Sequence, residues 1–285
     1  MQSPLRILVQ HIWPNPAQDS LLGDGMRVVY QCQEELMRRV IDGEVHIVQS
    51  FNPASAYYTN CASMEAYNNV GMLEGLRRAD AEDFDVAFIT CGNDPAVEAA
   101  RDLLHTPVVS ATESAMLIAC TLGRRFGCVT FDEESTVLVD RNIRAFGLEH
   151  RALPFNPARS AGFHEGCQRW FEDAGYLRDV VIPRFEQVAK GLIADGADVI
   201  IGACGNFAAL PYHGYAKVTG TQVPVLDAVA SGAQMAALVG RQRRALGIST
   251  SKQRGFKGVS RDIAGQVLAP FARMWDEADA GSVSR

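Results

Sequence analysis

Two stretches of the chain share one pattern, an acidic residue, a short apolar run and a Cys-Gly-Asn ending: Asp85-Val86-Ala87-Phe88-Ile89-Thr90-Cys91-Gly92-Asn93 and Asp198-Val199-Ile200-Ile201-Gly202-Ala203-Cys204-Gly205-Asn206. Continuous apolar runs of this kind are typical of strands buried on both faces of a parallel sheet. A Pro-led apolar run follows each stretch, at Pro107–Ser110 and near Val223–Leu226. The repetition predicts two similar α/β lobes. It does not predict a solenoid, whose repeats rarely exceed about 50 residues.

Apolar runs alternate with amphipathic stretches along the rest of the chain. We expect strands at Leu5–Val9, Val45–Gln49, Val86–Thr90, Pro107–Ser110, Phe126–Thr130, Arg151–Pro154, Val199–Ala203 and Val223–Leu226. Helices are expected at Met26–Val40, Pro95–Leu104, Ser135–Phe146 and Val180–Ala194, with Asp94 as the N-cap of the second and Pro183 as a start or a kink in the last. This alternation predicts parallel sheets with right-handed crossovers.

Length and charge narrow the class of protein. At about 150 residues per domain, 285 residues correspond to about two domains. The chain carries 27 basic and 33 acidic residues, a net charge of −6. That balance disfavours nucleic acid and anionic membranes as partners, because both require clustered basic residues. No run of about 18 apolar residues occurs, and Met1–Pro14 does not resemble a signal peptide.

Seven cysteines are an odd number, and in a chain of 285 residues they do not form the dense, even set of disulfides of a small secreted domain. We therefore expect reduced thiols and a cytoplasmic protein. The chain has no Gly-x-Gly-x-x-Gly after a strand, no Walker loop and no Cys-x-x-Cys or His-Glu-x-x-His. We therefore expect no metal and no cofactor.

Cys91 and Cys204 are the candidate catalytic residues. Each ends a predicted strand, and ligands bind beyond the carboxyl ends of strands in α/β sheets. The following glycine lets backbone N–H groups approach a ligand, and a helix N-terminus is expected to lower the pKa of the thiol. A single strand-end cysteine is as often a small core residue, but two at equivalent positions favour a function.

Two facing thiols can invert a stereocentre. One thiolate removes a proton from one face of a carbon, and the other thiol returns a proton to the opposite face. The enolate formed in between needs hydrogen-bond donors, for which we expect the turns at Gly92, Asn93, Gly205 and Asn206.

The segment Cys91-Gly92-Asn93-Asp94-Pro95-Ala96-Val97-Glu98-Ala99-Ala100-Arg101 resembles the first cysteine motif of the hydantoin racemase branch of the aspartate/glutamate racemase superfamily. Further resemblances follow in the family's order, at Arg6–Val9 with Asn15-Pro16, Pro107–Val109 with Glu113–Ala115, Leu122–Thr130, Gly196–Gly205 and Gly247–Lys252. The resemblance implies two pseudo-symmetric Rossmann-like lobes, each a mostly parallel sheet flanked by helices, with the active site in the cleft between them and no cofactor. It implies that residues 1–112 plus 229–285 form lobe 1, with Cys91, and that residues 113–228 form lobe 2, with Cys204.

The chain also departs from this family. It has extra polar sequence at Phe51–Asn69 and Asn156–Gly175. Gly92 stands where a bulkier residue is common, and Asn206 with Phe207 replaces a Gly-Met-like pair. Because these positions adjoin the substrate, they leave its identity open. The superfamily includes arylmalonate decarboxylases, which keep only the second cysteine, and maleate isomerases, which use both.

The resemblance and the paired cysteines together predict a cofactor-independent racemase acting on a 5-substituted hydantoin or allantoin. Alternatives are an aspartate or glutamate racemase, a maleate-type cis-trans isomerase with a nucleophilic cysteine, and a two-lobed small-molecule-binding protein in which the cysteines are incidental. We expect a small-molecule substrate and a homo-oligomer.

Other residues are candidates of lower weight. Asn15, Thr112 and Thr130 are expected to bind substrate beside the Cys-Gly-Asn turns, although Asn15 could equally cap its loop. His11 and Trp13 could line the pocket or pack in the core. Asp94 and Glu113 are interpreted as helix caps, His213 as a packing residue, and Lys252, Arg254 and Lys257 as a solvated loop. The remaining cysteines, Cys32, Cys61, Cys120, Cys128 and Cys167, match no motif.

Overall fold

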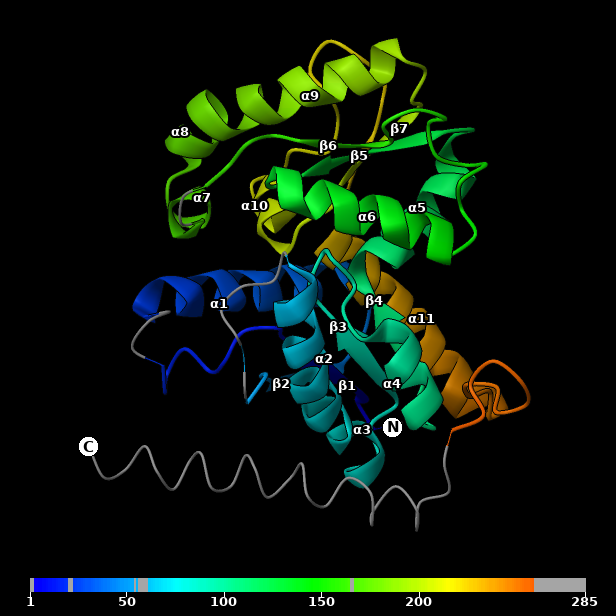
Figure 1. The fold of residues 1–285 in the computed structure, drawn as a ribbon. Coiled ribbons are helices and arrows are strands. Elements are labelled where there is room, and N and C mark those ends of the chain that lie inside the picture. The colour runs from blue at the N-terminus through cyan, green and yellow to red at the C-terminus, as the bar shows by residue number, and fades with distance from the viewer. Residues whose placement is uncertain (1–2, 20–22, 54, 56–60, 165–166, 259–285) are drawn as a thin grey trace.

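The computed structural model describes residues 3–19, 23–53, 55, 61–164 and 167–258. These residues form two parallel sheets of four strands, one above the other in Figure 1. The lower sheet has the order β2-β1-β3-β4 and consists of β1 (Leu5–Gln10), β2 (Val45–Ser50), β3 (Val86–Ile89) and β4 (Val108–Ser110). The upper sheet has the order β6-β5-β7-β8 and consists of β5 (Phe126–Thr130), β6 (Ala158–Ser160), β7 (Val199–Gly202) and β8 (Val225–Asp227).

The two orders are the same when β1 to β4 are matched with β5 to β8 in turn. The expected pair of pseudo-symmetric α/β lobes is therefore confirmed. Cys91 and Cys204 follow the equivalent inner strands β3 and β7.

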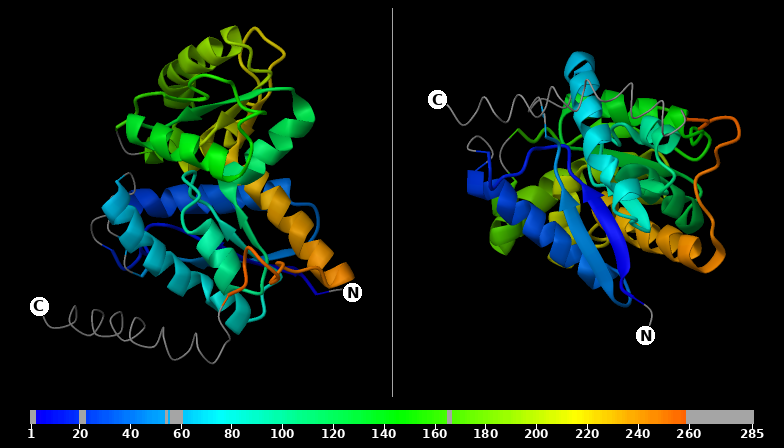
Figure 2. Two further views of the ribbon diagram at one scale, coloured as in Figure 1. Left: turned by 45° about the vertical axis from the view of Figure 1, so that its right-hand side comes forward. Right: turned by 90° about the horizontal axis from the view of Figure 1, so that it is seen from below.

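Helices flank both sheets, as the three views in Figures 1 and 2 show. They are α1 (Gly23–Val40), α2 (Ala62–Leu76), α3 (Arg78–Ala81), α4 (Val97–Leu103), α5 (Ala111–Leu122), α6 (Glu133–Ala145), α7 (Gln168–Glu172), α8 (Ala174–Tyr176), α9 (Ile182–Ala194), α10 (Ala209–Tyr212) and α11 (Ala228–Leu246), with a π-helical turn at Leu177–Val181 and a 3-10 turn at Gly205–Ala208. Pro183 lies in the first turn of α9, which continues from α8 through the π-helical turn with helical backbone at Val181, so it marks an irregularity within a longer helical run and not a free helix start.

One predicted strand is wrong. Arg151–Pro154 makes only an isolated bridge, between Ala152 and Phe126. The fourth strand of the upper sheet is instead Ala158–Ser160, which pairs with Cys128–Thr130. This short edge strand has half-buried polar residues at Arg159 and Ser160, so it lacks the apolar run that marks the inner strands.

The predicted helix start at Asp94 is also wrong. Helix α4 begins at Val97, after Ala96 in the left-handed conformation (φ 58°). The carboxylate of Asp94 instead accepts the backbone N–H groups of Thr112 and Glu113, at 2.9 and 2.8 Å, and so caps the following helix, α5. Asp94 therefore ties the first cysteine turn to α5.

The core continues from one sheet into the other. A single cluster of buried apolar side chains includes Val9 and Val86 of the lower sheet and Val129 and Ile200 of the upper one. Helix α11 crosses from the end of β8 to the lower sheet, against which it packs (Figure 1). The lobe boundaries at 112/113 and 228/229 stay predictions, and the last part of the predicted lobe 1, residues 259–285, lies outside the described residues. None of the described helices is long and apolar enough to span a membrane.

Candidate active site

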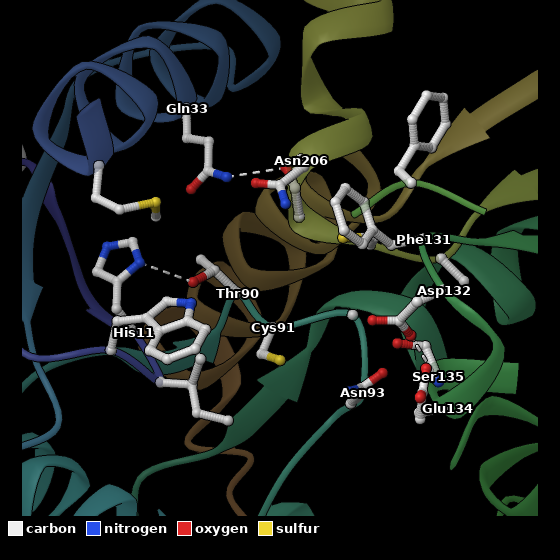
Figure 3. Close-up of a pocket in the computed structure, with 18 of the residues that line it drawn as sticks. His11, Gln33, Thr90, Cys91, Asn93, Phe131, Asp132, Glu134, Ser135 and Asn206 are labelled. Carbon is white, nitrogen blue, oxygen red and sulfur yellow. Dashed lines mark hydrogen bonds between the residues drawn. The ribbon is translucent and has the colours of Figure 1, made fainter. Parts of the chain in front are cut away.

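A cavity of about 570 Å³ lies at the carboxyl ends of both sheets. From the lower sheet, residues after β1 and β3 and the facing side of α1 line it; from the upper sheet, residues after β5, β6 and β7 do so. Figure 3 shows Cys91 between His11 and Thr90 on one side and Asn93 on the other, with Phe131, Asp132 and Ser135 opposite. The cavity therefore occupies the position expected for the site, and both Cys91 and Cys204 line it.

The two cysteine turns share two backbone hydrogen bonds. The backbone N–H of Asn93 donates to the thiol of Cys91, and that of Asn206 donates to the thiol of Cys204. The carbonyl of each cysteine accepts an N–H from the third residue on, Asp94 or Phe207, at 3.0 Å. The Cys-Gly-Asn repeat in the sequence is thus a repeated local structure.

Position 92 has no room for a side chain, because the two cysteine turns are in contact there. A Cβ atom at Gly92 would lie 2.6 Å from the Ala203 carbonyl oxygen and 2.6 Å from the Cα of Cys204. On the other turn, a Cβ at Gly205 would lie 3.2 Å from the Thr90 carbonyl oxygen. The residue after each cysteine therefore packs against the residue before the other, which brings the two strand ends together.

Side chains from neighbouring elements hold these glycines. Thr112 donates its hydroxyl to the Gly92 carbonyl at 2.7 Å, and the amide nitrogen of Gln33 donates to the Gly205 carbonyl at 2.9 Å. From the opposite lobe, Asn142 on α6 donates to the Asn93 carbonyl at 2.7 Å. The turns are thus fixed by both sheets and by α1, α5 and α6.

Burial keeps both thiols protonated at neutral pH. Burial raises the pKa of Cys91 to about 12, against the smaller opposing effect of the Asn93 N–H, and the charge of Cys204 raises it further. Burial also raises the pKa of Cys204 to about 12, with Asp132 and Asp227 adding negative charge nearby. The expectation of a lowered pKa is therefore wrong, because desolvation outweighs the donors at each turn.

Six of the predicted site residues line the cavity: Cys91, Gly92, Asn93, Cys204, Gly205 and Asn206. The other three lie outside its described lining. Thr112 is buried against Gly92, Thr130 donates its hydroxyl to the Asp132 carbonyl at 3.0 Å, and Asn15 accepts the N–H of Ala17 at 3.0 Å within its own loop. Their expected contacts with substrate stay predictions.

Sequence reasoning missed the part of the wall that α1 contributes, including Tyr30 and Gln33. It also missed Phe131, Asp132, Glu134 and Ser135, which follow β5. These residues carry no motif, and only the general rule that sites lie at carboxyl ends of strands could have pointed to the second group.

His11 lines the cavity and belongs to a buried hydrogen-bonded chain. Its Nε2 faces Gln49 Oε1, and the amide nitrogen of Gln49 donates to Glu34 at 2.7 Å. On this assignment His11 Nε2 is the donor, and Nδ1 accepts from the Thr90 hydroxyl at 3.0 Å. Burial lowers the pKa of His11 to about 4, so the imidazole is neutral and fixes Thr90 beside Cys91.

Several other candidates lie apart from the thiols. His213 bonds the Phe171 carbonyl, and Lys252 donates to the carbonyls of Arg101 and Asp102 at the end of α4. Cys61 lines the rim of the cavity, whereas Cys128 and Cys167 are core residues. Within the described residues, no cluster of three or more His, Cys, Asp or Glu side chains could hold a metal ion.

Two repeated α/β lobes with equivalent strand-end cysteines at one cavity define a two-lobed α/β enzyme whose site is built by both halves. The chain belongs to the Asp/Glu/Hydantoin racemase family, whose model matches residues 26–236. It is thus an isomerase of the racemase class.

Curated relatives support this assignment, and a solved structure shares the fold. A hydantoin racemase of Rhizobium meliloti is 29% identical in an alignment of 201 residues that covers 66% of this chain and 72% of that protein. A hydantoin racemase of Pseudomonas sp. (strain NS671) is 26% identical over 217 residues, 75% of this chain and 78% of that protein. The structure of an allantoin racemase from Klebsiella pneumoniae has the same fold, with a TM-score of 0.70 at 22% identity, covering 90% of this chain and 94% of that one.

Proposed function

We propose that the chain is a cofactor-independent racemase in which Cys91 and Cys204 act as opposed acid and base on a 5-substituted hydantoin or on allantoin. The observation that carries the proposal is the placement of the two cysteines in equivalent turns at one cavity. The hydantoin racemases among its relatives support the substrate class.

The proposed reaction moves one proton at each face of the substrate. One cysteine, as thiolate, takes the proton from the ring carbon next to a carbonyl, and the C–H electrons remain on the substrate as an enolate. The other cysteine, as thiol, gives its proton to the opposite face of that carbon, which leaves the two cysteines with exchanged roles. The N–H groups of Asn93 and Asn206 stabilise whichever cysteine is the thiolate, and those of Gly92 and Gly205 are candidates for the enolate oxygen.

The charges on the cavity wall favour an uncharged ring over a free amino acid or a dicarboxylate. Asp132 and Glu134 line the cavity, and none of the described lining residues is lysine or arginine. A carboxylate substrate would approach these acidic side chains, and the described lining has no lysine or arginine side chain to offset them. The amino-acid racemase and the maleate-type isomerase are therefore the less supported alternatives. Membership of a racemase family also disfavours the alternative of a small-molecule-binding protein without activity.

The cytoplasmic location and the homo-oligomeric state of the enzyme stay predictions. All seven cysteines are free, as a reducing cytoplasmic location would require. Self-association into a homo-oligomer is tested by measuring the molar mass in solution.

A substrate panel in deuterated water tests the proposal. Single enantiomers of 5-substituted hydantoins, allantoin, aspartate and glutamate are incubated with the enzyme, and optical rotation and deuterium content are followed. We expect loss of rotation, with one deuterium gained at the ring carbon, for hydantoins or allantoin. Exchange confined to aspartate or glutamate would contradict the proposed substrate, and saturable binding without exchange on any compound would contradict the reaction.

A further inference from the structure

Two polar atoms buried in the cavity wall have no hydrogen-bond partner among the described residues: the hydroxyl oxygen of Tyr30 and Oε1 of Gln33. Both residues line the cavity, and their exposed fractions are only 7% and 3%. Folded proteins satisfy about nine in ten buried polar groups, because an unpaired group loses its bonds to water without replacement. Of the five such atoms among the described residues, these two belong to residues that line the cavity, where a ligand can supply the partners.

The two residues act from one face of one helix. Tyr30 and Gln33 are three positions apart on α1, which places their side chains on neighbouring turns of the same face. The ring of Tyr30 is held by His11, at 4.0 Å between ring centroids. Figure 3 shows Gln33 extending from α1, with its amide nitrogen directed to the turn of Asn206 and its oxygen on the opposite side, toward His11 and Thr90.

Each side chain has an oxygen that is not used in hydrogen bonding within the described residues. The amide nitrogen of Gln33 is committed to the Gly205 carbonyl, so its oxygen remains as an acceptor. The buried Tyr30 hydroxyl stays protonated, because burial and the nearby Cys91 both raise its pKa, and it can donate. This part of the wall therefore offers one donor and one acceptor.

We propose that Tyr30 and Gln33 recognise the amide edge of a cyclic ureide, with Tyr30 donating to a ring carbonyl and Gln33 accepting from the adjacent ring N–H. This inference rests on the proposed function and names the part of the substrate that residues of α1 bind. A carboxylate presents two acceptors and no donor, so it would leave the Gln33 oxygen unpaired and facing an anion. The pair thus favours hydantoins or allantoin over a dicarboxylate such as maleate.

Calorimetric titration tests the pair directly. Hydantoin, its 1-methyl and 3-methyl derivatives and maleate are titrated into the wild-type protein and into Tyr30→Phe and Gln33→Met. The matched controls are Tyr215→Phe and Gln168→Met. In the wild-type protein the Tyr215 hydroxyl donates to Glu186 away from the cavity, and the Gln168 amide donates to Glu172 on α7. We expect each test variant to raise the Kd for hydantoin about tenfold, and each control to leave it unchanged.

The methylated rings separate recognition from a structural effect. In the wild-type protein, methylation of the nitrogen that faces Gln33 is expected to raise the Kd about tenfold, and in Gln33→Met this penalty should disappear. An unchanged penalty in Gln33→Met, a wild-type Kd in Tyr30→Phe, tighter binding of maleate than of hydantoin, or no binding of hydantoin would each overturn the inference.

Deuterium exchange on the same ligands distinguishes this inference from the proposed function. If hydantoins bind with the predicted pattern but no chiral hydantoin exchanges its ring proton, the recognition stands and the racemisation fails. If exchange occurs and the methylation penalty is the same in every variant, the racemisation stands and the recognition fails.

Discussion

The protein shifts the pKa of each of the two thiols by opposing effects. Desolvation and neighbouring negative charge hold both pKa values near 12, while the N–H of the second residue after each cysteine acts in the other direction. A thiol buried in this way is a weak acid, and the thiolate formed from it is a strong base. Such a base suits the removal of a proton from a carbon, although only a small fraction of the enzyme carries the thiolate at neutral pH.

The pH dependence of the rate follows from these pKa values. The neutral thiol loses its proton as pH rises, so far below pH 12 the thiolate fraction grows about tenfold per pH unit. We expect kcat/KM to rise between about pH 6 and about pH 8, by less than that factor per unit near pH 7, because burial raises the pKa of Asp94 and of Asp227 to about 7 and their ionisation raises the pKa of the neighbouring thiols. Initial rates at low substrate concentration check this, and a plateau that begins below about pH 7 would contradict it. Titration of His11 should not interrupt the rise, because its pKa is already lowered to about 4.

The turns after β3 and β7 are the elements that make the site. Their sequence signal is strong, because an apolar run followed by Cys-Gly-Asn identified both turns and the strands before them. What the sequence could not supply is the partner of each turn. Nothing near Gly92 in the chain indicates that its Cα packs on Cys204, and nothing near Asp94 indicates that its carboxylate caps α5.

Replacing Gly92 with alanine tests the contact between the turns. The added Cβ would meet the backbone of Ala203 and Cys204 at 2.6 Å, so one turn must move away from the other. We expect unfolding to become easier by about 1–3 kcal/mol and kcat/KM to fall about 100-fold, measured by urea denaturation and by racemisation rate. Gly255→Ala is the control, since nothing lies within 4 Å of its added Cβ. Equal behaviour of the two variants would show that the turns do not touch as described.

Asp94→Ala tests the cap on α5. The substitution removes the acceptor for two N–H groups in the first turn of that helix, which typically costs about 1–2 kcal/mol of unfolding free energy. Asp24→Ala, which removes an exposed residue in the first turn of α1, should cost well under about 1 kcal/mol. Denaturation midpoints compare the two, and a loss at Asp94 no larger than at Asp24 would refute the capping role.

At the scale of the whole molecule, the two lobes share one core. Sequence periodicity predicted seven of the eight strands near their observed positions, because buried parallel strands are continuous apolar runs. It gave no residue range for α2, α5 and α11, nor for the short helices α3, α7, α8 and α10. Helix α11 packs mainly through small residues such as Ala233, Gly232 and Ala236, which carry little hydrophobic signal. A Cβ at Gly232 would lie 2.3 Å from the Phe88 ring, so close packing selects the residue there.

A shared core predicts that the lobes unfold together. Side chains from both sheets belong to one buried cluster, and α11 packs on both, so loss of one lobe exposes the apolar surface of the other. We expect a single transition in urea when far-ultraviolet circular dichroism and tryptophan fluorescence are followed together. Two separated transitions would indicate that each lobe is stable alone.

We propose that Cys91 and Cys204 each serve one face of the substrate. This is tested by racemisation and deuterium uptake of each pure enantiomer of a hydantoin by wild type, Cys91→Ala and Cys204→Ala. Cys120→Ala is the control, since its thiol lies outside the described lining of the cavity. We predict that each active-site variant loses racemisation by about 10³-fold or more, and that Cys120→Ala keeps the wild-type rate. Racemisation at the wild-type rate by both Cys91→Ala and Cys204→Ala would contradict the two-base account.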